Sequence, residues 1–172
     1  ADRVQDPGNL GTMIRGAVAA GASCVVTTPN TVDALSPKVV RAAAGSMFAV
    51  PVVSETSLND VRDAGFTVVG TSSHVHPGVV VYDHFDFTRR VAVVMGNEAA
   101  GLANDAPVDS WVTIPHEGPV ESLNVAMAAT VLCFEVARQR NASSGERPAS
   151  TRRASSRCRL KPGSRPTPVG AS

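Results

Sequence analysis

The sequence predicts an α/β domain in which a mostly parallel sheet carries helices on both faces. Short apolar runs alternate with segments of helical periodicity from the first residues to about residue 139, and this alternation is typical of parallel sheets. Residues 91–95 are continuously apolar, which predicts a central strand. Ligands of such sheets bind beyond the carboxyl ends of the strands, so the loops at those ends are candidate sites.

The first helix is expected at residues 10–18, after a turn at residues 6–9 that contains proline and glycine. Asn9 is placed to cap this helix, and Gly21 follows its end. Five apolar residues recur at helical spacing: Leu10, Met13, Ile14, Ala17 and Val18. Residues 3–5 resemble the end of a strand whose earlier residues are missing.

The middle of the chain continues the alternation. A second helix is expected at residues 38–44, because Ser36 and Pro37 form a typical helix start and Gly45 a typical end. A third is expected at residues 57–64, before Gly65. Short apolar runs predict strands at residues 24–27, 50–53, 66–70 and 79–82.

The last strand and helix enclose a loop with glycine and proline. Residues 111–114 predict a strand that stops at Pro115, and the loop contains Gly118 and Pro119. Ser122 is placed to cap a helix over residues 123–137 that is apolar almost all round. Such a helix is expected to be buried on every side. An ordinary strand–loop–helix unit remains an alternative to a ligand site here.

Charge divides the chain into two predicted parts. Residues 1–140, the predicted folded domain, carry a net charge of −5, whereas residues 141–172 carry +6. The second part is rich in Ser, Pro, Gly and Arg with little to bury, which predicts a disordered basic tail. It is either a source of phosphate affinity or a solvated extension.

Composition indicates a cytoplasmic setting. No apolar run reaches 18 residues, so no transmembrane helix is expected, and no signal peptide is evident. The three cysteines, Cys24, Cys133 and Cys158, share no metal or disulfide spacing. A reducing cytoplasm is therefore the simplest compartment, and no metal site is predicted.

Three loops fall at carboxyl ends of predicted strands: residues 70–72, 96–102 and 114–122. Glycines in such loops allow a ligand to lie against main-chain groups. Gly96 and Gly101 match neither the dinucleotide fingerprint nor the P-loop. Glu98 would repel a pyrophosphate and tolerate a cation, which disfavours NAD or ATP held through phosphates.

Three motifs follow one another along the chain. They are Asp6-Pro7-Gly8-Asn9-Leu10-Gly11-x-x-x-Arg15, Val94-Met95-Gly96-Asn97-Glu98-x-x-Gly101-Leu102, and Ile114-Pro115 up to Ser122-Leu123-Asn124-Val125-Ala126. In this order they resemble the motifs of the SpoU/TrmH family of RNA ribose 2′-O-methyltransferases, within the SPOUT superfamily. Residues 36–48 also resemble family members that act on ribosomal RNA. The resemblance covers about residues 3–139.

The resemblance implies an α/β domain with a deep trefoil knot, an exception to the rule against knots. It implies S-adenosylmethionine bound in the knot, RNA as substrate, and a homodimer formed through helices that include the last one. The residues implied to line the methyl-donor pocket are Thr71, Gly96, Ile114 and Leu123. The implied catalytic group is Arg15 with Asn9, Glu98, Ser122 and Asn124, and Arg41 is implied to contact RNA phosphate.

Methylation of a ribose hydroxyl requires such a group. The hydroxyl is a weak nucleophile, so the enzyme must position it and stabilise the incipient alkoxide. No metal is required, because a sulfonium is already a good leaving group. Arg15 would stabilise the alkoxide, and Glu98 and Asn124 would hold its guanidinium; whether Arg15 also accepts the proton stays open, because arginine is nearly always protonated.

Other readings stay open beside this one. Arg15 is also compatible with a solvated surface arginine, and His116 stands where the family more often has an apolar residue. The acidic body leaves RNA binding to a second subunit, the basic tail or missing N-terminal residues. The candidate functions are a ribosomal RNA methyltransferase, a transfer RNA methyltransferase, or a truncated, catalytically silent RNA-binding protein.

Overall fold

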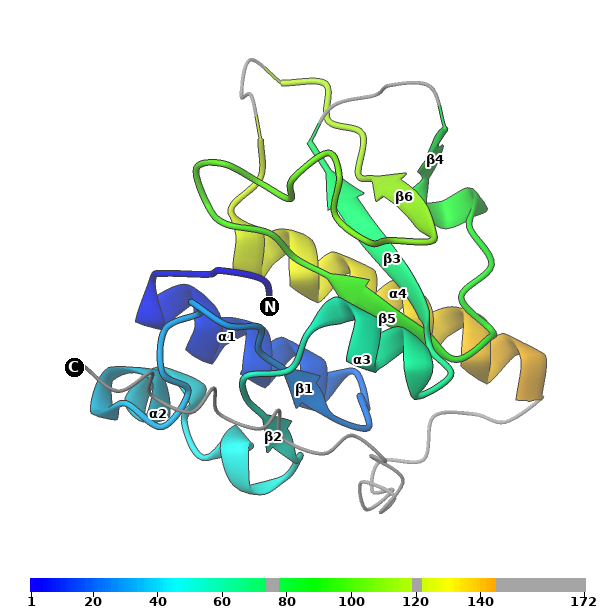
Figure 1. The fold of residues 1–172 in the computed structure, drawn as a ribbon. Helices are drawn as coiled ribbons and strands as arrows, with labels where there is room; N and C mark the ends of the chain where they lie inside the picture. Colours follow the sequence, from blue (N-terminus) through cyan, green and yellow to red (C-terminus); the bar gives the residue numbers. More distant parts are fainter. Residues whose placement is uncertain (74–77, 119–121, 145–172) are drawn as a thin grey trace.

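The computed structural model describes residues 1–73, 78–118 and 122–144 (Figure 1). Its elements are α1 (Pro7–Ala19), β1 (Val25–Val26), α2 (Pro37–Ala43), the 3₁₀ helix η1 (Ser46–Phe48), β2 (Val52–Val53), α3 (Leu58–Asp63), β3 (Thr67–Ser72), β4 (Val79–Val81), the 3₁₀ helix η2 (Tyr82–His84), β5 (Val91–Val94), β6 (Ser110–Thr113) and α4 (Val125–Ser144). The predicted disorder of the tail from residue 145, Cys158 and the predicted loop position of Pro119 lie outside the described residues.

All described strand pairs are parallel. Four strands form one sheet in the order β4-β6-β3-β5, and β1 pairs with β2 in a second. The prediction of a mostly parallel sheet is therefore confirmed. The strand β6 lies between β3 and β4, although it follows both along the chain.

The position of β5 differs from the prediction, since β5 is the last strand of its sheet rather than a central one. The first residues of the chain explain its apolar character. The Asp2 amide donates to the Met95 carbonyl just after β5 at 2.8 Å, and the Ala1 carbonyl accepts from Thr28 just after β1 at 3.0 Å. Residues 1–2 thus lie between the two sheets and join them.

Two apolar cores cover opposite faces of the sheet, which confirms helices on both sides. The larger core contains Leu10 and Ile14 of α1, Val112 of β6 and Leu132 of α4. The smaller core packs Val61 of α3 against strand residues and Leu102, among others. In the ribbon of Figure 1, α4 runs along the sheet beside α1.

The start of α1 corrects the predicted cap. Asp6, not Asn9, caps the helix: its Oδ1 accepts from the Asn9 amide at 2.7 Å, and Pro7 occupies the first turn. Proline suits that position because its missing N–H would have no helical partner. The cap leaves the Asn9 side chain available for contacts outside the helix.

The start of α4 corrects a second cap. Asn124, not Ser122, caps this helix, because its Oδ1 accepts from the Ala126 and Met127 amides at 2.9 and 3.2 Å. The helix also runs past residue 137 to Ser144. Gln139 explains the extension: its side chain donates to the Phe85 carbonyl at 2.9 Å and accepts from the Phe87 amide at 2.8 Å.

The predicted burial of this helix on every side is wrong for the single chain. Ala126, Ala129 and Leu132 are buried, but Met127, Val131 and Phe134 are exposed, Met127 by 65%. These three residues share one face because they are spaced by four and three positions. We call Met127, Val131 and Phe134 the α4 stripe.

The remaining elements follow the sequence closely. Ser36 caps α2, and Ser57 with Asp60 forms a capping box at the start of α3. Gly65 ends α3 with a φ of +83°. The strands β1 and β2 are shorter than expected, with two residues each. Within the described residues, no helix has the length and apolarity that crossing a membrane requires.

Candidate functional site

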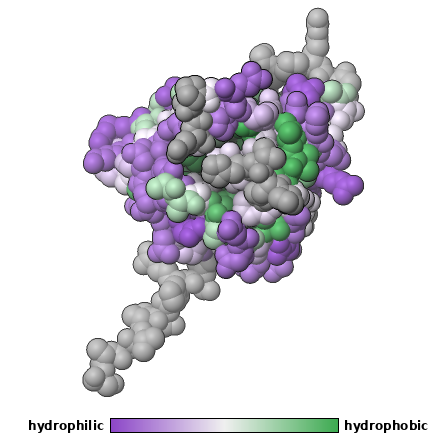
Figure 2. All heavy atoms as spheres, turned by 90° about the horizontal axis from the view of Figure 1, so that it is seen from above, coloured by the Kyte–Doolittle hydropathy of each residue, from purple (hydrophilic) through white to green (hydrophobic). Residues whose placement is uncertain are grey.

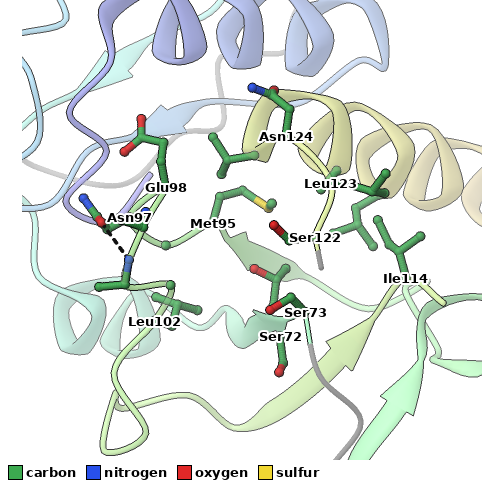
Figure 3. A pocket seen from close by; sticks show the side chains of 18 of the residues that line it. Ser72, Ser73, Met95, Asn97, Glu98, Leu102, Ile114, Ser122, Leu123 and Asn124 are labelled. Atoms are coloured by element: carbon green, nitrogen blue, oxygen red, sulfur yellow. Dashed lines mark hydrogen bonds between the residues drawn. The ribbon is translucent and has the colours of Figure 1, made fainter. Parts of the chain in front are cut away.

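The carboxyl ends of β3, β5 and β6 and the start of α4 enclose a cavity of about 510 Å³. That volume is typical of small-molecule sites. Figure 3 shows side chains from all three predicted loops turned toward this cavity. Eight predicted site residues line it: Asn9, Thr71, Gly96, Glu98, Ile114, Ser122, Leu123 and Asn124. From above, apolar residues gather toward the middle of this face and hydrophilic ones around its margin (Figure 2).

The loop after β5 presents its backbone to the cavity. Asn97 and Gly101 exchange two backbone hydrogen bonds of 3.2 and 2.8 Å, and Gly101 has a φ of +65°. The Asn97 side chain accepts from the amides of Ala99 and Ala100 at 3.0 and 2.9 Å. A Cβ on Gly96 would collide with the backbone of Gly101 and Leu102, so only glycine fits there.

Thr71 joins two strands at the edge of the cavity. Its hydroxyl donates to the Val94 carbonyl at 2.9 Å, which ties the end of β3 to the end of β5. The hydroxyl therefore has a structural partner, and a ligand would meet mainly the backbone beside it. This agrees with a pocket that recognises its ligand through main-chain groups.

A hydrogen-bonded relay connects the three sequence motifs. Glu98 accepts from the backbone amides of Gln5 and Asp6 at 3.1 and 3.0 Å, and from the Asn9 side chain at 3.2 Å. Asn9 in turn accepts from the Asn124 amide group at 3.0 Å. Because Asn124 caps α4 through its oxygen, the relay fixes the orientation of both side-chain amides. We call Glu98, Asn9 and Asn124 the amide relay.

The relay also sets the charge of Glu98. Burial raises the pKa of this carboxyl, but hydrogen bonds from the amides of Asp6 and Gln5, its own amide and the Asn9 side chain together lower the pKa below its usual value. Glu98 is therefore ionised at neutral pH. Among the lining residues that the structure describes, Glu98 is the one carboxylate, and none of them is a lysine or arginine.

Apolar side chains form the rest of the wall. Met95 is buried directly before Gly96, and Ile114 and Leu123 lie on the opposite side in Figure 3. His116 also lines the cavity, with its Nδ1 3.3 Å from the Ile114 carbonyl oxygen. Residue-by-residue transfer of the motifs missed the remaining lining residues: Ser72, Ser73, Met95, Asn97, Leu102, Asn104, Trp111 and Val125 among them.

Position along the strands could have found several of these residues. Ser72 is the last residue of β3, Ser73 follows it, and Met95 follows β5. All three therefore lie at the carboxyl edge of the sheet. Trp111 gives no such signal, because it is the second residue of β6 and not at its carboxyl end.

Two predicted residues lie elsewhere in the single chain. Arg15 is exposed on α1, six residues after Asn9 and thus roughly 9 Å farther along the helix. Arg41 is exposed in the last turn of α2. Neither lines the cavity. Among the described residues, no cluster of three metal-binding side chains occurs.

Comparisons with known proteins agree with this geometry. A family model described as the SpoU rRNA Methylase family matches residues 1–134. A 23S rRNA (uridine(2479)-2′-O)-methyltransferase of Streptomyces viridochromogenes is 39% identical over 148 residues, which are 81% of this chain and 51% of that protein. A 23S rRNA (guanosine(2553)-2′-O)-methyltransferase of Bacillus subtilis is 39% identical over 142 residues, 78% of this chain and 55% of that protein.

A solved structure supports the same relationship. The AdoMet-bound rRNA methyltransferase of Sinorhizobium meliloti has a TM-score of 0.72 and 41% identity, covering 80% of this chain and 54% of that one. The chain spans about half the length of the curated relatives it matches.

Proposed function

The chain belongs to the SpoU rRNA Methylase family, and on that basis we propose that it is an S-adenosylmethionine-dependent methyltransferase acting on a ribose 2′-hydroxyl of ribosomal RNA. The amide relay carries the proposal, since it brings polar groups of all three motifs to the wall of one cavity. The relatives with 39% identity are named for that reaction on 23S rRNA. A cytoplasmic location, where such RNA is found, belongs to the same proposal.

The cavity fits S-adenosylmethionine. That molecule carries a cationic sulfonium and no phosphate, and the described lining includes a carboxylate but no cationic side chain besides His116 if protonated. The tight loop at Gly96 leaves backbone groups facing the cavity. We infer that Thr71, Gly96, Ile114 and Leu123 hold the molecule, which when bound supplies an electrophilic methyl group.

Arg15 is proposed to act from a second copy of the chain. Its guanidinium would stabilise the negative charge that develops on the ribose oxygen as the proton is lost. In one chain it lies outside the cavity, but the next residue, Gly16, faces Thr130 of α4, where an added Cβ would lie 2.7 Å from the Thr130 hydroxyl. A partner that covers the adjacent α4 stripe would therefore approach Arg15.

The α4 stripe supports a homodimer. Three large apolar side chains on one helix face remain exposed in the single chain, and covering them removes apolar surface from water. We further infer the trefoil knot, because β6 is inserted between two earlier strands, and Ile114 after β6 and Asn124 before α4 both line the cavity. Both belong to the proposed function.

The central experiment combines binding with transfer. Calorimetric titration of the chain with S-adenosylmethionine, followed by methyl transfer to bulk ribosomal and transfer RNA and mass spectrometry of the RNA, is expected to show binding and one new ribose methyl group in ribosomal RNA. Binding without transfer would support the catalytically silent alternative. Transfer to transfer RNA alone would support that substrate, and no binding would refute the proposal.

Arg15 has a matched control. Arg15→Ala is expected to keep S-adenosylmethionine binding and lose turnover, whereas Arg89→Ala, which removes another exposed arginine, is expected to keep both. Mixing inactive Arg15→Ala chains with inactive Gly96→Val chains is expected to restore activity, because a hybrid dimer contains one complete site. Full activity of Arg15→Ala would remove Arg15 from the mechanism.

A further inference from the structure

A second surface of the chain combines exposed apolar and cationic residues around α2. Phe48 is 89% exposed and Leu35 is 74% exposed, more than any other large hydrophobic residue described. Lys38 and Arg41 between them are also exposed. We call Lys38, Arg41 and Phe48 the α2 surface.

The cations of this surface have no acidic partner among the described residues. The ion pairs among the described residues of the chain involve arginines at positions 3, 62, 89 and 138 but neither Lys38 nor Arg41. The nearest acid before them along the chain, Asp33, accepts from the Leu35 amide at 2.9 Å. In a body of net charge −5, two unpaired cations beside an exposed aromatic ring provide complementarity to a polyanion.

The backbone holds Phe48 in a fixed position. Ala44 ends α2 in the left-handed region with a φ of +47°, and Gly45 follows with +80°. That conformation costs about 1–2 kcal/mol for a residue other than glycine, and strain of this kind often accompanies function. The next residues form η1, in which Met47 packs against the core while Phe48 faces solvent. Phe48 therefore exposes its ring to solvent on a turn that Met47 attaches to the core.

The α2 surface lies close to the proposed catalytic site. A Cβ on Gly11 of α1 would overlap Ala42 and the backbone of Ala43, so α1 and α2 pack in close contact. Packed helices have axes about 8–10 Å apart. Asn9, which lines the cavity, is two residues from Gly11. An RNA strand that places one nucleotide at the proposed catalytic site would thus extend over α2.

We propose that the α2 surface binds unpaired RNA next to the nucleotide that is methylated. One base stacks on Phe48, and phosphates on either side of it contact Lys38 and Arg41. Aromatic stacking requires bases that are not covered by a neighbour in a duplex, which selects loops and single strands. The identity of the RNA as substrate rests on the proposed function, whereas the binding surface itself does not.

Fluorescence anisotropy with a labelled single-stranded RNA of mixed sequence tests the surface directly. Phe48→Ala is expected to weaken binding about 5- to 150-fold, the range for loss of one stacked base, with an unchanged salt dependence. Phe48→Trp is expected to restore affinity, and Leu35→Ala, which removes exposed apolar area without a ring, to retain it. Lys38→Gln and Arg41→Gln are each expected to reduce the slope of log affinity against log salt by about 0.7.

Each outcome decides the question. Equal RNA affinity of Phe48→Ala and the parent chain, an equal loss in Leu35→Ala, or no RNA binding by the parent chain would overturn the inference. Loss of affinity that accompanies a changed oligomeric state in sedimentation would assign the surface to a protein contact and also overturn it. Titration with S-adenosylmethionine separates the two proposals, since failure there refutes the proposed function and leaves the anisotropy result standing.

Discussion

Glu98→Gln measures the strength of the amide relay. The carboxylate accepts three hydrogen bonds from other residues, two on Oε1 from Asp6 and Asn9 and one on Oε2 from Gln5. A glutamine retains one acceptor oxygen, and its best orientation keeps the Asp6 and Asn9 bonds. Its NH₂ group then faces the Gln5 N–H, so that hydrogen bond is lost. The other two become weaker, because a neutral amide oxygen replaces the charged carboxylate.

The expected destabilisation is about 1–2 kcal/mol. Hydrogen bonds to charged groups contribute about 1.5–3 kcal/mol each, and Glu98 is exposed enough to place the loss at the low end. The effect depends on pH. Because the hydrogen bonds lower the folded-state pKa of Glu98, its contribution is complete above the unfolded pKa of about 4.3 and is lost as pH falls through the lower folded value.

Urea unfolding followed by circular dichroism is the assay, at pH 7 and again near pH 3, with unchanged m-values as the test of two-state behaviour. Glu55→Gln is the control, since the Glu55 carboxylate has no hydrogen-bond partner among the described residues. The stability difference between the parent chain and Glu98→Gln should shrink at the lower pH. A difference below about 0.3 kcal/mol at pH 7, or one that does not change with pH, would refute the reasoning.

Substitutions at three further positions test other parts of the fold. Gly96→Ala is expected to cost about 1–3 kcal/mol and to weaken S-adenosylmethionine binding in calorimetry, because the new methyl group collides with the backbone at Gly101; unchanged binding would contradict the tight loop. Asn124→Ala should lose about 1 kcal/mol of unfolding free energy, whereas Asn124→Asp keeps the cap and loses only the bond to Asn9. Ser57→Ala should lower unfolding free energy by about 1 kcal/mol without changing cofactor affinity in the same titration.

The sequence was sufficient to predict the parallel sheet, the helices on both faces and the meeting of three loops at one edge. These features follow from local patterns, because apolar runs and glycines mark strands and their ends. The cavity at that edge brings together Gly96, Ile114 and Leu123, which are far apart along the chain. Family membership, too, was readable from the motifs and is shown by the comparisons.

The caps could not be predicted from local patterns. Asp6 and Asn9 both have the chemistry of a helix cap, and so do Ser122 and Asn124. The choice depends on distant residues: Glu98 engages the Asn9 amide across 89 positions, and Asn9 engages Asn124 across 115. A side chain that is needed in such a relay is unavailable for a cap, or performs both tasks as Asn124 does.

The exposure of α4 and the distance of Arg15 from the cavity have a similar origin. Apolar composition shows that a surface tends to be covered but does not show by what. The α4 stripe is apolar, as predicted, yet no part of the described chain covers it. The position of β5 likewise depends on residues 1–2, whose backbone completes the contact between the sheets.

The insertion of β6 between β3 and β4 has a consequence for the order of assembly during synthesis. Until residues 110–113 leave the ribosome, β4 has no neighbouring strand in this sheet, since β6 is its only assigned partner among the described strands. In the nascent chain, β4 therefore stays unpaired in this sheet while some 30 residues are added after it. Translation pauses placed before residue 110 are expected to yield a protease-sensitive intermediate, and pauses placed after α4 a protected one.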